Sequence, residues 1–158
     1  MKSSEMLKIV KEMINKESEY SADIQELANR ISNPILKALI NGVAMESRKH
    51  SLFYSAIAEL LSGRGNLLSQ EDIEILSSNL QRHIDMEKEM MELTHSLVED
   101  VEDPRLKMIL TAIYLDEIEH HRLLTTISSY ITKYMREREE EFWNSMWRDS
   151  PWHGGPGG

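Results

Sequence analysis

The chain contains no cysteine among its 158 residues. Disulfide bonds, cysteine-ligated zinc, iron–sulfur clusters and thiol catalysis are therefore excluded. The absence of cysteine also suits a reducing compartment. The first residues contain no apolar run of the length found in a signal peptide, and no segment approaches the length of a membrane span. We therefore expect a cytoplasmic protein with no membrane-embedded part.

Basic residues are also scarce. The sequence has 18 lysines and arginines against 27 aspartates and glutamates, which gives a net charge of −9. A protein that binds nucleic acid needs a basic face to neutralise phosphates, so this balance argues against such a partner. Surface solubility accounts for most acidic excesses of this kind, but carboxylates are also the ligands of cation sites.

Residues that break helices are few and are concentrated in short segments. There are four prolines, and six of the seven glycines lie within residues 62–66 and 153–158. Asn33-Pro34 and Asp103-Pro104 each place a capping side chain before a proline, which is typical of the start of a helix. Ser69, three residues before Asp72, resembles a capping box. The sequence therefore favours long helices joined by few turns.

These signals predict four helices, over residues 3–32, 34–62, 69–101 and 104 to about 145. Because the first and last connections are very short, each pair of helices must form an antiparallel hairpin. We expect an all-α, antiparallel up-down-up-down four-helix bundle over residues 1–142. A tail over residues 143–158 would follow, and its Trp143, Trp147 and Trp152 are candidates for docking on the bundle or on a protein partner.

The two halves of the chain repeat each other at an offset of 70 residues. The aligned pairs include Asn33 with Asp103, Pro34 with Pro104, Glu17 with Glu87, Glu46 with Asp116 and His50 with His120. Convergent patterning of helical hairpins is the alternative explanation, but here polar positions match as well as apolar ones. Two hairpins with one shared pattern are expected to pack about a pseudo-twofold axis, with any shared site near it.

Polar residues interrupt the apolar stripe of every predicted helix. They are Glu17 in the first helix, Glu46 and His50 in the second, Glu87 in the third, and Asp116 and His120 in the fourth. The stripes themselves have the spacing of a helix face that packs into a core. Burying such groups without partners would cost several kcal/mol each, so a stable fold must neutralise them.

The interrupting residues also lie at matching heights. Glu17 and His50 are equidistant from the first short connection, and Glu87 and His120 are equidistant from the last one. Two arrangements would neutralise such a set: a pair of divalent metal ions, or hydrogen bonds among the groups themselves. Oxygen and nitrogen ligands without sulfur suit iron or manganese, and zinc fits the same ligands. We predict two metal ions, with iron as the first choice.

This constellation resembles the ferritin-like di-iron carboxylate superfamily, particularly rubrerythrin-type erythrins, across roughly residues 5–135. That family supplies one glutamate from each of two helices and a Glu-x-x-His motif from each of the other two. The resemblance implies that Glu17 and Glu87 are the single glutamates. It also implies that Glu117-x-x-His120 is one of the two motifs.

The second helix departs from the family pattern. The residue three positions before His50 is Ser47, and the nearby acid is Glu46, four positions before. Either both halves use an acid-x-x-x-His variant, with Asp116 as the second acid, or the site is asymmetric and Glu117 is a ligand. Both alternatives remain open from the sequence.

The resemblance implies iron binding and reaction with dioxygen or peroxide. An oxidase or peroxidase of this kind would need a separate protein as electron donor, because the chain has no cysteine to hold an electron-transfer iron. Two other functions compete: iron binding or storage, and a non-enzymatic four-helix interaction module with a vestigial metal site. No segment encodes the short fifth helix of cage ferritins, so we expect a homodimer rather than a cage.

Overall fold

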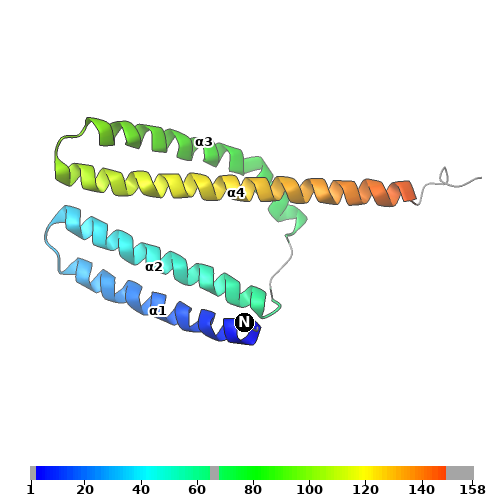
Figure 1. Ribbon diagram of the computed structural model, residues 1–158, viewed down its shortest axis with the longest axis horizontal. Helices are drawn as coiled ribbons and strands as arrows, with labels where there is room; N and C mark the ends of the chain where they lie inside the picture. Colours follow the sequence, from blue (N-terminus) through cyan, green and yellow to red (C-terminus); the bar gives the residue numbers. More distant parts are fainter. Residues whose placement is uncertain (1–2, 65–67, 149–158) are drawn as a thin grey trace, which may run out of the picture. The chain divides into compact units, whose positions relative to one another are not determined.

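The structure is a computed structural model that describes residues 3–64 and 68–148, apart from the side chains of residues 142, 143 and 145–148. Within these ranges it contains four helices and no strand (Figure 1). The helices are α1 (Ser3–Asn29), α2 (Pro34–Leu61), α3 (Gln70–Asp100) and α4 (Pro104–Arg148). The all-α prediction is confirmed. Residues 149–158 of the predicted tail, Trp152 among them, and the side chains of Trp143 and Trp147 lie outside the described part.

The chain divides into two compact units. One comprises residues 1–68 with residues 100–112, and the other comprises residues 69–99 with residues 113–158. The first unit contains the α1–α2 hairpin, and the second contains α3 with most of α4. Within each pair the helices run antiparallel, as the short connections require (Figure 1).

Local side chains determine where the helices begin. Asn33 caps α2, because its Oδ1 accepts hydrogen bonds from the backbone N–H groups of Ile35 and Leu36 at 3.0 and 3.1 Å. Asp103 caps α4 by accepting from the N–H of Arg105 at 2.9 Å. A hydrogen bond from the Arg105 guanidinium holds the pKa of the Asp103 carboxyl well below its ordinary value. The caps predicted from the two Asx-Pro pairs are confirmed.

The start of α3 and the end of α2 also follow local chemistry. The Asp72 N–H donates to Ser69 Oγ at 3.0 Å, while the Ser69 N–H donates to the Asp72 carboxylate at 3.1 Å. This is the reciprocal pairing of a capping box. At the end of α2, Gly63 adopts a φ of 71°, and the N–H of Arg64 reaches the carbonyl of Glu59 at 3.0 Å. A left-handed glycine followed by such a bond closes a helix by the Schellman pattern.

The predicted end of the first helix was wrong by three residues, because α1 ends at Asn29. The N–H groups of Arg30 and Ile31 bond to the carbonyls three residues earlier, at 3.1 Å each, which tightens the last turn. Asn33 must adopt an extended conformation, φ −69° and ψ 120°, in order to cap α2. Residues 30–32, between the end of α1 and the cap of α2, form the connection.

Small side chains bring α1 and α2 together. Ala28 and Ala44 are buried, and Ser47 is the buried polar residue of the described chain. Ser21 Oγ donates to the carbonyl of Ala44 at 2.7 Å, which ties one helix directly to the backbone of the other. Further hydrogen bonds join Ser18 to Ser51 at 2.9 Å and Gln25 to Asn41 at 2.7 Å. Each bonded pair is nearly equidistant from the connection, so the register is the one that the sequence predicts.

Larger apolar side chains make the core of the second unit. The buried residues are Ile73, Leu80 and Ile84 of α3 and Ile131 of α4. Nearer the α3–α4 connection, the rings of His95 and Tyr114 lie 5.1 Å apart and tilted by 55°. This pair is also nearly equidistant from its connection, so the second hairpin has the same kind of register as the first.

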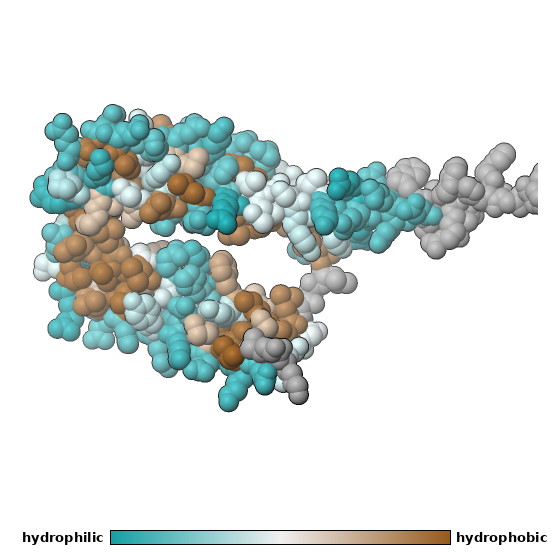
Figure 2. Space-filling model, in the orientation of Figure 1, coloured by the Kyte–Doolittle hydropathy of each residue, from teal (hydrophilic) through white to brown (hydrophobic). Residues whose placement is uncertain are grey.

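The apolar stripes differ in burial between the helices. Those predicted for the first and third helices are buried or half-buried, as expected. On α2 and α4, most of the stripe is exposed, including Phe53 at 50% and Tyr130 at 61%. Figure 2 shows apolar side chains gathered over α2 on the viewed face. Each hairpin by itself therefore leaves one apolar side uncovered. None of the described helices combines the length and apolar character that a membrane crossing requires.

Replacing Asn33 with alanine is expected to lower the free energy of unfolding by about 1 kcal/mol, the usual contribution of an N-cap side chain. The reason is that two backbone N–H groups of α2 would lose their acceptor. Urea titration followed by circular dichroism measures the change. Asn15→Ala, an exposed substitution inside α1, is the matched control and should be neutral or slightly stabilising. Equal effects of the two substitutions would contradict the capping role.

Candidate metal centre

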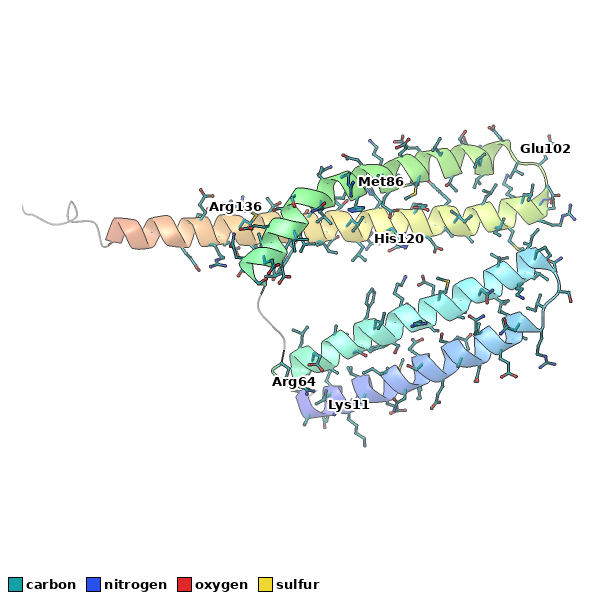
Figure 3. The ribbon with its side chains drawn as sticks, turned by 180° about the vertical axis from the view of Figure 1, so that it is seen from behind. Lys11, Arg64, Met86, Glu102, His120 and Arg136 are labelled. Atoms are coloured by element: carbon teal, nitrogen blue, oxygen red, sulfur yellow. The ribbon has the colours of Figure 1, made fainter. Side chains whose placement is uncertain are left out.

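Three potential metal ligands meet on α3 and α4: Glu87, Glu117 and His120, hereafter the α3–α4 cluster. Glu117 and His120 share one side of α4 because they are three residues apart. Glu87 comes from the matching height of α3, and Figure 3 shows its neighbour Met86 and His120 at corresponding points along the two helices. One ligand atom from each residue lies within 4.8 Å of the other two. The Nδ1 atom of His120 is 3.8 Å from Glu87 Oε2.

The carboxylates of this cluster lack the partners that burial normally demands. Among the described side chains, the buried oxygen and nitrogen atoms without a hydrogen bond are Oε2 of Glu87 and Oε2 of Glu117. The pKa of Glu117 is raised above its ordinary value, chiefly because its protonated form hydrogen-bonds Glu87, and also by partial burial and repulsion from that carboxylate. Without a cation, the pair of carboxylates is stabilised by holding a proton.

Asp116 does not belong to this cluster. Its side chain is exposed, whereas Glu117 is half-buried against α3. The helical angles place these two acids on opposite flanks of His120, and the position of α3 selects the Glu117 flank. In the second half of the chain, the acid brought to the histidine is therefore Glu117, three positions before it.

The first half of the chain has a related but looser arrangement, the α1–α2 cluster of Glu17, Glu46 and His50. Glu17 Oε1 lies 3.5 Å from His50 Nδ1, so the predicted matching height is observed. Glu46 Oε2 lies 3.9 Å from the other ring nitrogen, Nε2, and 2.5 Å from the ammonium of Lys49. The two carboxylates therefore face opposite nitrogens of the imidazole, and one of them already pairs with a cation.

The α3–α4 cluster suits a divalent metal ion. Carboxylate oxygen and imidazole nitrogen are ligands shared by iron, manganese and zinc. Ligand atoms about 2.0–2.2 Å from an ion lie at most about 4.4 Å from one another, so a spread of 4.8 Å needs only a small side-chain adjustment. The side chain of His120 is 48% exposed, whereas that of Glu87 is only 18% exposed. The carboxylate side is thus sheltered, and the histidine side is open to solvent.

Two further residues shape the α1–α2 cluster: Ser47, which marks the departure from the family pattern in the sequence, and Lys49, which did not stand out from the sequence. Ser47 occupies the position that repeats as Glu117, and it is buried. Lys49 occupies the position that repeats as Glu119, and it neutralises Glu46. The offset of 70 residues contains the difference between Lys49 and Glu119, and comparing charge position by position would have found it.

A groove of about 460 Å³ on the α1–α2 hairpin is lined by none of the candidate metal ligands. Small side chains line much of it, together with Gln25 and Arg48, and it includes no carboxylate and no histidine. Among the described residues, the α3–α4 cluster alone brings three acid or histidine ligand atoms within 4.8 Å of one another, and the α1–α2 cluster is the looser second candidate. No protein-family model, no curated protein and no solved structure matches this chain.

Proposed function

We propose that this protein is a ferritin-like di-metal protein that binds two divalent metal ions, with iron as the first choice. One ion would bind at the α3–α4 cluster and one at the α1–α2 cluster. The observation that carries the proposal is the pair of buried, unpartnered oxygens of Glu87 and Glu117 beside His120. Such groups need a proton or a cation, and at neutral pH a divalent ion satisfies both carboxylates at once.

The proposal extends to an oxidase or peroxidase that acts on dioxygen or peroxide in the cytoplasm. Bound iron would supply the redox chemistry. The protein's own contribution would be to hold the ions through carboxylates on the sheltered side and to leave the imidazole side accessible to a small substrate. Since the chain has no cysteine, a separate protein would deliver the electrons.

Metal stoichiometry tests the proposal. After anaerobic loading with ferrous iron and removal of free metal, elemental analysis is expected to find two metal ions per chain. A Glu17→Ala/Glu87→Ala double variant should lose them, because each substitution removes a carboxylate from one cluster. The matched control is Glu19→Ala/Glu89→Ala, two exposed glutamates that repeat at the same offset. Equal metal content in both double variants would contradict the proposed ligands.

The competing functions make different predictions for the same sample. An interaction module with a vestigial site would bind no stoichiometric metal, and its clusters would be hydrogen-bonded remnants. Iron storage in a cage would require an assembly far larger than the homodimer that we propose, and light scattering separates the two. Stoichiometric iron in a dimer that consumes peroxide or dioxygen would favour the enzyme.

A further inference from the structure

The two clusters differ in the number of ligands that they can offer to one ion. In the α3–α4 cluster, Glu87, Glu117 and His120 place their ligand atoms within 4.8 Å of one another. Elsewhere in the described chain, no other group of three histidines or acids meets this spacing. At the α1–α2 cluster, a metal ion at Nδ1 of His50 would reach Glu17 but not Glu46, which lies at the other ring nitrogen.

The local charge also favours metal binding at the α3–α4 cluster. Residues 46–50 carry one carboxylate and two cations, whereas residues 116–120 carry three carboxylates and no cation. The charged residues are Glu46, Arg48 and Lys49 in the first segment and Asp116, Glu117 and Glu119 in the second. Glu119 has a partner in Arg122, at 3.6 Å, one turn further along α4. Because a divalent cation responds to the charges around it, the second segment attracts it more strongly.

Lys49 acts on the α1–α2 cluster directly. Its ammonium lies 2.5 Å from Glu46 Oε2, the oxygen that also faces His50. A metal ion held by Glu17 and His50 could recruit Glu46 as a third ligand only by drawing this carboxylate away from the ammonium, so the Lys49–Glu46 pair competes with metal binding. The competition is modest, because the Lys49 and Glu46 side chains are 39% and 44% exposed and solvent screens the pair.

We infer that the two metal sites of this protein are inequivalent and load in order: the α3–α4 cluster first, and the α1–α2 cluster second, against competition from Lys49. The inference rests on the proposed metal binding and adds an order to it. Over a range of metal concentrations the protein would hold a single ion. The chemistry that needs two ions would therefore begin only when the supply of metal is high.

Binding isotherms of Mn²⁺ with the full-length protein at pH 7 test the order, with free metal measured by its electron paramagnetic resonance signal. We expect two steps whose dissociation constants differ by about tenfold or more, as for sites that differ by one charged ligand. Glu117→Ser, which copies the α1–α2 arrangement into α4, should remove the tight step. Glu17→Gln should remove only the weak step. Lys49→Gln should tighten the weak step by about threefold and leave the tight one unchanged.

His95→Ala is the control, because this exposed histidine pairs with Glu99 outside both clusters, and it should leave both steps unchanged. Two equal sites in the unsubstituted protein would overturn the inference while supporting the proposed function. Loss of both steps in Glu17→Gln would also overturn the order. No binding by the unsubstituted protein would overturn the proposed function and the inference with it.

Discussion

Zinc at 100 times the dissociation constant of the α3–α4 cluster is expected to raise the midpoint of thermal unfolding by about 5–10 °C. Binding to the folded state alone contributes about 2.7 kcal/mol at that excess, and a domain of this size gains about 2–4 °C per kcal/mol. The ion would replace the repulsion between Glu87 and Glu117 with attraction to both carboxylates. Differential scanning calorimetry with and without zinc measures the shift.

The ligand dependence of this shift makes the test specific. Glu87→Gln should abolish most of the stabilisation, because the amide keeps the shape of the side chain but cannot bind the ion as an anion. Glu89→Gln, an exposed change two residues away, should retain it in full. A similar stabilisation in both variants would show that zinc acts elsewhere on this acidic chain.

The fold was largely predictable because the signals that define it are local. Asn33, Asp103 and Ser69 each cap a helix within three residues of themselves, and such contacts follow from the sequence alone. The end of α1 was less predictable, since it depends on how tightly the last turn winds before Asn33 caps the next helix. The burial of the stripes on α2 and α4 was not predictable from periodicity. Helical periodicity identifies the apolar side of a helix, but it does not say which part of the protein packs against that side.

The height of the candidate site along the helices was predictable from the sequence, but the choice of its ligands was not. Matching distances from the connections placed Glu17 beside His50 and Glu87 beside His120, and the structure has both pairs within 4 Å. The choice between Asp116 and Glu117 needed the position of α3, because the two acids flank His120 almost equally. That choice depends on tertiary packing, which helical angles alone do not contain.

In the metal-free protein, Glu117→Gln is expected to increase the free energy of unfolding at pH 7, by an amount on the order of 1 kcal/mol. The pKa of Glu117 is raised in the folded state above its ordinary value of 4.5, so this carboxyl binds more protons in the folded state than in the unfolded state between these two values. Stability from this group is therefore lost as the pH rises through that window. Glutamine keeps the neutral shape at every pH and removes the penalty.

The difference between variant and parent should shrink as the pH falls through this window and become small at pH 4, where most of Glu117 is protonated in both states. Urea titrations of both proteins in a chelator, from pH 4 to 8, follow this difference. The two denaturation curves must be compared at each pH, because Asp72 and Asp103 have lowered pKa values and contribute stability of the opposite sign. With saturating zinc the order should reverse, since the carboxylate of Glu117 is then a ligand and its loss destabilises the protein. A variant less stable than the parent without metal at pH 7 would mean that the two carboxylates do not repel each other in the folded state.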